Sequence, residues 1–296
     1  MSSERRHLVL VNPTAGGGRV GQVLSQVERA LQERRIAHRL VRTTSVEHGR
    51  REALHAAAGA EIPVVVGGDG LIGKVGGALA GGDVPLGVIP AGRGNDFARV
   101  VGIPTDIPLA ADLLAAGTTR TIDVGEVNGR RFLCIASCGF DSDANRIANE
   151  ARLVPGNVVY LYAALRALAG WRPACFEILL DGKRHEFVGY SIAAANSKSY
   201  GGGMFVAPDA ELDDGKLDVV WTRQTSKLHF LANLPKVFKG RHVRNDEVTV
   251  LRGSEVEIRA DRDFAVYADG DHLASLPATV RVLPRALKVI APTPGP

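Results

Sequence analysis

The sequence predicts an α/β protein of two domains: an N-terminal doubly wound parallel sheet and a mainly antiparallel, β-sandwich-like second domain. Strand and helix patterns alternate over the first third of the chain, which is typical of a parallel sheet with right-handed crossovers. After Asp123 the pattern changes to short strands joined by hairpin turns. The length of 296 residues also exceeds that of most single domains. We therefore expect one domain over residues 1–123 and a second over 124–281.

Four strand-to-helix units make up the expected first domain. The predicted strands are apolar and each precedes a turn; they cover residues 7–11, 38–44, 64–66 and 85–90. Apolar residues at helical spacing predict a helix over 19–35, and Ser45 is placed to cap the next helix, over 46–58. A short helix follows the third strand.

Hairpin turns characterise the expected second domain. Asn128-Gly129 and Asp181-Gly182 are typical two-residue hairpin turns between apolar runs. Further strands are expected within 247–253, 254–260 and 264–271, together with two or three helices.

Composition excludes several classes of protein. Hydrophobic residues make up 45% of the chain and charged residues 23%, as in ordinary globular domains. The longest apolar run, 158–171, is too short to cross a bilayer and contains Arg166. The N-terminus lacks the apolar stretch of a secretory signal, and three cysteines cannot form a disulfide framework. We therefore expect a cytoplasmic protein with free thiols.

Three glycine-bearing turns follow three strands of the first domain, at 12–19, 67–70 and 91–96. Glycine lets the backbone approach a ligand closely, and amides at a helix start favour a phosphate. Each turn alone is equally well read as a tight connection, but three at one sheet edge favour a nucleotide polyphosphate site. The spacing matches neither the dinucleotide nor the P-loop pattern. Asp69 within the second turn would repel a phosphate unless a cation intervenes, which indicates Mg²⁺.

A series of motifs runs in order along nearly the whole chain: VNPTAGGG, VVVGGDG, GVIPAGRGNDFAR, GFDSDAN, NSKSYGGGMFVAPDAELDDGKLDVV and YADGD. This series resembles the diacylglycerol kinase catalytic-domain family, in its bacterial soluble lipid kinase branch, which is related to sphingosine kinases. The resemblance implies a nucleotide domain like that of NAD kinases and phosphofructokinases. It further implies phosphorylation of a lipid hydroxyl by ATP with Mg²⁺, in a cleft between the two domains. Family members often return their last strand to the first domain, so 282–296 would complete it.

The resemblance also assigns residues. Asp271 would be the general base and Asp69 the acid of the Mg-nucleotide complex. The structural Mg²⁺ site would use Asp214 with main-chain oxygens of Glu211 and Lys216. The positions expected to contact ATP are Asn12, Pro13, Thr44, Gly67, Gly68, Gly70, Leu71, Ile72, Arg93, Gly94 and Asn95.

Some residues depart from the family pattern, and simpler readings stay open. Leu71, Gly73 and Lys74 replace a threonine, a polar residue and an acid; Arg93 replaces a small hydroxyl residue; and Asp271 is one methylene shorter than the usual glutamate. The simpler reading of Asp271 and Asp214 is that each is the acid of an Asp-Gly turn, which is compatible with a role in a metal loop. The alternative functions are a kinase for a soluble nucleotide such as NAD, and a non-catalytic binder of lipid or nucleotide.

One segment, 223–244, holds six basic residues and no acid, and removing these leaves 30 basic and 32 acidic residues. Its mixture of leucine, phenylalanine and lysine suits a broken amphipathic helix at an anionic membrane, where the lipid substrate lies. The alternative is a solvated helix that packs its apolar side on the second domain. The segment matches no nucleic-acid-binding module, so we expect no nucleic-acid partner. A homodimer is left open.

Overall fold

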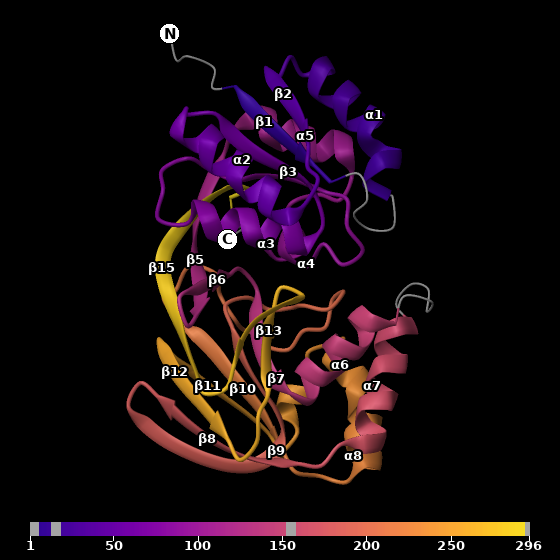
Figure 1. The fold of residues 1–296 in the computed structure, drawn as a ribbon, viewed down its shortest axis with the longest axis vertical. Helices are drawn as coiled ribbons and strands as arrows, with labels where there is room; N and C mark the ends of the chain where they lie inside the picture. Colours follow the sequence, from indigo (N-terminus) through magenta and orange to yellow (C-terminus); the bar gives the residue numbers. More distant parts are fainter. Residues whose placement is uncertain (1–5, 13–18, 152–157, 294–296) are drawn as a thin grey trace. The chain divides into compact units, whose positions relative to one another are not determined.

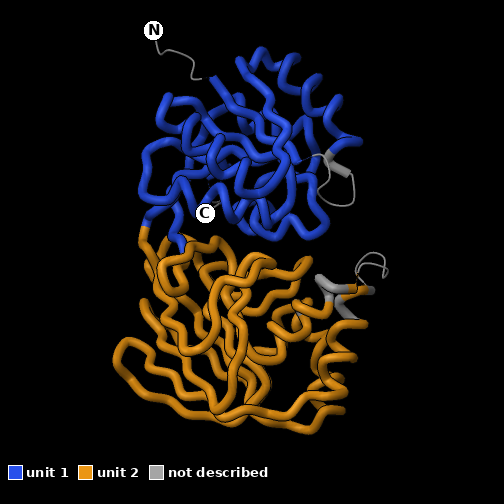
Figure 2. The backbone as a smooth tube through the Cα atoms, in the orientation of Figure 1, with its two compact units in different colours: residues 1–124, 285–296 blue, residues 125–284 orange. Residues whose placement is uncertain are grey.

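The computed structural model describes residues 6–12, 19–151 and 158–293. These residues form two compact units, one of residues 1–124 with 285–296 and one of residues 125–284 (Figure 2). The chain passes between the units twice, in the long strands β5 (Thr119–Val127) and β15 (Ala278–Ile290).

The first unit is a parallel sheet flanked by helices (Figure 1). Its strands run in the order β2-β1-β3-β4, and each pair is parallel. The strands are β1 (His7–Val11), β2 (His38–Arg42), β3 (Ile62–Gly67) and β4 (Gly87–Pro90). The helices are α1 (Arg19–Glu33), α2 (Val46–Ala58), α3 (Asp69–Leu79), α4 (Asp96–Val101) and α5 (Ile107–Ala116).

Local sequence explains these elements. The side chains of Val64 to Val66 are fully buried, as expected for a central parallel strand. Ser45 caps α2 as predicted, because its hydroxyl accepts a hydrogen bond of 3.0 Å from the amide of His48. The end of β15 joins the sheet beside β4: the amide of Leu86 donates to Lys288 O, and the amide of Ile290 donates to Leu86 O, both at 2.8 Å.

The second unit is mainly antiparallel. A continuous path of strands runs β14-β13-β7-β9-β8-β12-β15-β5-β6, with β10 pairing with β9 and β11. The strands not yet bounded are β6 (Arg130–Phe132), β7 (Ile135–Gly139), β8 (Ala174–Leu180), β9 (Lys183–Ala195), β10 (Leu217–Arg223), β11 (Val248–Gly253), β12 (Glu255–Ala260), β13 (Ala265–Ala268) and β14 (Asp271–Ser275). The helices are α6 (Phe140–Glu150), α7 (Val158–Gly170), α8 (Lys227–Val237) and the short 3₁₀ helix η2 (His242–Arg244). The predicted fold class, a parallel α/β sheet followed by an antiparallel β-sandwich-like domain, is therefore confirmed.

Both predicted hairpin turns form. Asn128 and Gly129 have φ values of 47° and 82°, and Asp181 and Gly182 have 46° and 81°. Two successive residues in the left-handed region produce the turn twist that matches two paired strands.

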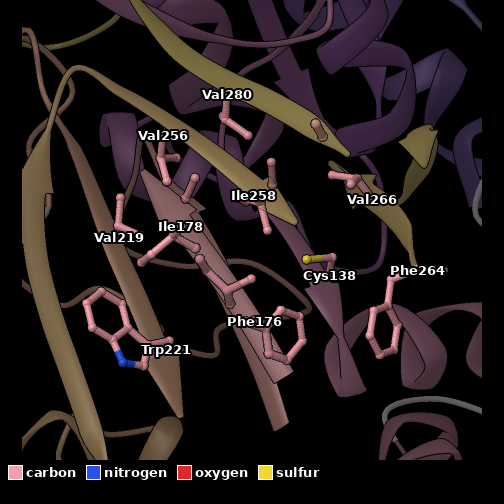
Figure 3. Packing of buried hydrophobic residues seen from close by; sticks show 14 of the residues in the cluster. Cys138, Phe176, Ile178, Val219, Trp221, Val256, Ile258, Phe264, Val266 and Val280 are labelled. Carbon is pink, nitrogen blue, oxygen red and sulfur yellow. The ribbon is translucent and has the colours of Figure 1, made fainter. Parts of the chain in front are cut away.

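The core of the second unit lies between its sheet and its helices. Ile178 of β8 lies opposite Ile258 of the neighbouring strand β12, and Trp221 of β10 belongs to the same cluster (Figure 3). Trp171, next to the end of α7, is 4% exposed and packs edge-on against Phe140 with ring centroids 5.6 Å apart. Helix α7 is therefore buried on one side, and among the described residues no helix is long and apolar enough to span a membrane.

Candidate active site

The glycine turns of the first unit begin side by side. Because β1 to β4 are parallel, their carboxyl ends lie at one edge of the sheet. Two hydrogen bonds continue the sheet past these ends: Thr43 N donates to Val11 O at 2.7 Å, and Ala91 N donates to Gly67 O at 2.9 Å. Open α/β sheets bind ligands at such an edge.

The turns at Gly68 and Gly92 touch so closely that both positions require glycine. A Cβ atom at Gly92 would lie 2.4 Å from Gly68 Cα, and one at Gly68 would lie 3.0 Å from Gly92 Cα. The Gly92 amide also donates to Asn95 Oδ1 at 2.8 Å, which orders the third turn. The second and third turns therefore form one packed backbone surface.

Two carboxylates converge beside these turns. Asp69 Oδ1 accepts a hydrogen bond of 3.0 Å from the amide of Phe97, at the start of α4. A Cβ at Gly94 would lie 3.1 Å from Asp69 Oδ2 and 2.9 Å from Asp96 Oδ2, so both second oxygens face the same position. Asp96 is buried and was missing from the residues assigned on sequence, although it directly follows the assigned pair Gly94-Asn95.

Helix α3 begins at Asp69, and no side chain caps its start. Its N-cap is Gly68, and the first amide to find a helical acceptor is that of Ile72, which donates to Gly68 O at 3.2 Å. The earlier amides have no acceptor within the helix. Apart from the backbone of α3 itself, no heavy atom of the residues that the structure describes lies within 4 Å of a Cβ placed on Gly70. The helix start therefore offers both amides and space to an anion.

Two of the predicted ATP contacts, Leu71 and Ile72, can reach a ligand only through their main chain. The side chains of Leu71 and Ile72 are 5% and 0% exposed, and Leu71 Cδ1 lies 2.8 Å from a Cβ placed on Gly49 of α2. Their side chains belong to the core of the first unit, so only their backbone amides can face a ligand.

Other predicted ATP contacts lie at the same edge. Thr44 is exposed, and its hydroxyl lies 3.2 Å from His48 Nδ1. The Arg93 side chain is exposed and makes no ion pair or hydrogen bond with the residues that the structure describes. Asn95 adopts the left-handed conformation, with φ of 53°. Asn12 directly follows β1, whereas Pro13 and most of the first glycine turn lie outside the described residues.

Lys74 stands opposite an acid. It is half-buried on α3, one turn after Gly70, and its charge contributes, after those of Arg50 and Arg51, to holding the pKa of Glu47 below its usual value. Glu47 lies in the first turn of α2. The hydrogen bond from Arg50 is the main cause of this lowered pKa, so Lys74 contributes only the last of three positive charges near Glu47.

In the second unit, Asp271 opens β14 directly after the Asp269-Gly270 turn. The Asp269 carboxylate accepts hydrogen bonds from the amides of Leu133, at 2.6 Å, and Cys134, at 2.9 Å. Asp269 thereby fixes the hairpin that carries Asp271 to the segment before β7. Asp271 is half-buried and pairs with Ala268 across the hairpin.

A second acid, Asp141, was missed by the sequence assignment. It lies in the first turn of α6, where burial raises its pKa to about 6 although Ser191 and Tyr200 donate hydrogen bonds to it. A carboxyl group with a strongly raised pKa is typical of functional sites. The GFDSDAN motif that contains it was recognised, but no role was assigned to its acids.

The predicted metal loop gathers acids around one arginine. Asp214 Oδ1 accepts a hydrogen bond of 2.9 Å from the amide of Lys216, and its other oxygen pairs with Arg252. Burial, with the charges of Asp209 and Glu211, raises the pKa of the neighbouring Asp218 to about 6. Among the described residues, no group of three or more acids, histidines or cysteines is arranged to hold a metal by side chains alone.

Two family models cover the chain. The diacylglycerol kinase catalytic domain matches residues 6–127, and the YegS C-terminal NAD kinase beta sandwich-like domain matches residues 134–291. These matches agree with the order of motifs in the sequence.

Curated relatives are similar over their full length. A diacylglycerol kinase of Mycobacterium tuberculosis is 38% identical, with 98% of each chain covered. One of Bacillus subtilis is 30% identical, with 97% of each chain covered, and a YegS-like probable lipid kinase of Pseudomonas aeruginosa is 31% identical, with 100% of this chain and 97% of the relative covered.

Two solved structures from Bacillus anthracis str. Sterne share the fold. One has a TM-score of 0.84 at 24% identity and covers 98% of this chain and 95% of its own. The other, of a diacylglycerol kinase, has a TM-score of 0.76 at 21% identity and covers 99% and 98%. The family predicted from the motifs is confirmed: this chain belongs to the family of diacylglycerol kinases and YegS-like lipid kinases.

Proposed function

We propose that this protein transfers the γ-phosphoryl group of ATP, with Mg²⁺, to the hydroxyl of diacylglycerol or a related lipid alcohol. The observation that carries the proposal is the edge of the first unit, where two packed glycine turns, an uncapped helix start and two carboxylates meet. Phosphoryl transfer depends mainly on positioning and charge neutralisation, and this edge offers groups for both.

The residues at this edge fit a Mg-nucleotide complex. Mg²⁺ is usually held by one or two carboxylates together with substrate phosphates, rather than by a cage of protein ligands. Asp69 and Asp96 supply such a pair, and the amides at the start of α3 supply donors for phosphate oxygens. When bound, the metal neutralises charge on the transferred group. The exposed guanidinium of Arg93 would add a further phosphate contact.

We assign the proton acceptor to Asp271. Its carboxylate would take the proton of the lipid hydroxyl while the hydroxyl oxygen bonds to the γ-phosphorus and the bond from that phosphorus to ADP breaks. The tie from Asp269 to Leu133 and Cys134 holds the hairpin that presents Asp271.

A structural Mg²⁺ at the loop of Asp214 is supported by the chemistry of its surroundings. Asp218 is 3% exposed, and its pKa is raised first by burial and then by the negative charges of Asp209 and Glu211. These acids place negative charge beside the loop of Asp214. A hard cation held by Asp214 and main-chain oxygens of Glu211 and Lys216 would relieve it.

Peripheral membrane contact through residues 223–244 is supported by what α8 leaves exposed. The core of the second unit is in contact with Phe230, Leu231 and Leu234. The alternative that α8 packs its apolar side on the second domain is therefore correct for these three residues. Leu228 nevertheless remains 81% exposed and Phe238 49% exposed, with exposed basic side chains around them. We propose that these two side chains insert at the membrane surface.

The experiment is incubation of the protein with γ-labelled ATP, Mg²⁺ and mixed micelles of diacylglycerol, sphingosine and bacterial lipid extract, with NAD present in a parallel aqueous reaction. Asp69→Asn is the matched control, because the amide oxygen can still accept from Phe97 N while the charge is lost. Label in the organic phase that is absent from the control supports the proposal and identifies the acceptor. Label on NAD alone, or ATP binding without transfer to any acceptor, refutes it.

A further inference from the structure

The side chain of His48 is tied to Thr44, at the sheet edge where the glycine turns begin. Thr44 follows β2 in a turn that continues the sheet, because Thr43 N donates to Val11 O at 2.7 Å. Both the amide and the hydroxyl of Thr44 lie 3.2 Å from Nδ1 of His48, which is half-buried in the first turn of α2. The Thr44 side chain is exposed, and within the described ranges its hydroxyl forms no other hydrogen bond.

The amide fixes the direction of both hydrogen bonds. A backbone N–H can only donate, so Nδ1 of His48 carries no proton and accepts. The Thr44 hydroxyl therefore also donates to this nitrogen, since an unprotonated Nδ1 has no hydrogen to give. The ring proton is on Nε2, which lies 3.7 Å from Glu52 Oε1. Because its hydrogen points at His48, the Thr44 hydroxyl presents only lone pairs to a ligand and can only accept.

The backbone around this pair is fixed on both sides. Ser45 caps α2 by accepting from the His48 amide, and Thr43 is 4% exposed. At Gly49 a Cβ would lie 2.8 Å from Leu71 Cδ1 and 3.4 Å from Thr43 Cγ2. The first turn of α2 is therefore packed against α3 and against the end of β2. A group that is already held in place loses little conformational entropy when a ligand binds to it.

Thr44 lies two strands away from the candidate phosphate position. The sheet order β2-β1-β3-β4 separates the end of β2 from the end of β3 by two strand spacings, or about 10 Å. A nucleotide whose phosphates lie at the start of α3, directly after β3, can extend its nucleoside over β1 toward β2. The amino group of adenine and the hydroxyl groups of ribose are hydrogen-bond donors, which suits an acceptor at this place.

We propose that His48 is a positioning residue for the nucleotide: it orients the Thr44 hydroxyl so that this oxygen accepts a hydrogen bond from the nucleoside of ATP. The donor is the 6-amino group of adenine or a ribose hydroxyl, and both have the chemistry that the oriented oxygen requires. The proposal rests on the ATP-dependent function proposed above. It assigns selectivity between nucleotides to a histidine that acts through its neighbour.

A set of variants separates the accepting atom from the rest of the His48 side chain. His48→Asn keeps an acceptor oxygen at the position of Nδ1, His48→Gln moves it one carbon farther out, and His48→Ala removes it. Glu52→Gln tests the contact with Nε2 alone. His55→Asn is the matched control, because His55 is exposed on the same helix and its side chain makes no hydrogen bond or ion pair with the part of the chain that the structure describes. Circular dichroism and thermal unfolding establish that each variant is folded.

The measurement is calorimetric titration of the full chain, without lipid, with Mg²⁺ and ATP, inosine triphosphate, 2′-deoxy-ATP or 3′-deoxy-ATP. Inosine has a carbonyl oxygen in place of the 6-amino group, and each deoxy nucleotide lacks one ribose hydroxyl. We expect the wild type to bind one of these analogues about tenfold more weakly than ATP, which identifies the donor. His48→Ala and His48→Gln should bind ATP about tenfold more weakly and no longer distinguish that analogue from ATP. His48→Asn, Glu52→Gln and His55→Asn should keep the ATP affinity of the wild type within about twofold.

Three outcomes would overturn the inference while ATP binding, and with it the proposed function, remains. The first is an unchanged ATP affinity in His48→Ala. The second is a wild type that binds ATP and all three analogues equally. The third is a loss in His48→Ala that is equal for ATP and every analogue, because a structural defect weakens all nucleotides alike. A wild type that binds no ATP would instead refute the proposed function together with the inference.

Discussion

Replacing Gly70 by alanine should separate stability from nucleotide binding. Outside the backbone of its own helix, the added methyl group would meet no atom of the described residues within 4 Å. Alanine also favours a helix more than glycine does, so the free energy of unfolding should stay equal or rise by about 0.5 kcal/mol. If a phosphate approaches the start of α3, however, the methyl group enters the space it needs. Overpacking of this kind costs about 1–3 kcal/mol, which corresponds to an ATP affinity about 5- to 150-fold weaker.

Calorimetric titration with ATP and Mg²⁺ measures the affinity, and urea unfolding of the same samples measures stability. Gly59→Ala is the matched control in the first unit, because Gly59 has φ of −86° and a Cβ there would meet its nearest atom at an ordinary 3.5 Å. Its ATP affinity should equal that of the wild type. A Gly70→Ala protein that binds ATP with wild-type affinity would refute the placement of the phosphates at the start of α3.

Three further substitutions test other parts of the structure. Gly92→Ala should lower the free energy of unfolding by about 1–3 kcal/mol in urea titrations, because its Cβ would lie 2.4 Å from Gly68 Cα; wild-type stability would contradict the close contact of the turns. Asp271→Asn should keep ATP affinity and lower turnover about 10²- to 10⁴-fold in the lipid kinase assay, and an unchanged rate would exclude Asp271 as the base. In metal-free buffer with a chelator, Asp218→Asn should stabilise the protein at pH 7 by up to about 3 kcal/mol, but not near pH 4. The native state keeps the Asp218 proton up to a pKa of about 6, so wild-type stability falls as the pH rises from about 4 to 6; an equal difference at both pH values would contradict this reasoning.

Local patterns predicted the elements of the first unit well. Apolar strands bounded by glycine and the cap at Ser45 depend on neighbours within a few residues, and such patterns can be read directly from sequence. The convergence of the glycine turns was also predictable, because parallel strands place their carboxyl ends at one edge. Strand limits were less accurate: β3 begins at Ile62, two residues before the predicted start of this strand at Val64.

Contacts between distant segments could not be predicted. Asp69 accepts from Phe97, 28 residues later, and Asp269 accepts from Leu133, 136 residues earlier. Neither hydrogen bond follows from a local pattern, because the residues next to a turn acid do not indicate which distant amide will donate to it.

Two residues that depart from the family pattern, Leu71 and Lys74, lie where they leave the predicted nucleotide edge intact. Leu71 places its side chain between α3 and α2, against Gly49, and leaves its amide at the helix start. Lys74 lies on α3 one turn after Gly70, and its charge acts on Glu47 of α2. Neither residue fills the space beside Gly70 or displaces the carboxylates of Asp69 and Asp96. Asp69 and Asp96 keep two carboxylates beside the start of α3, and this acid pair favours an active kinase over a non-catalytic binder.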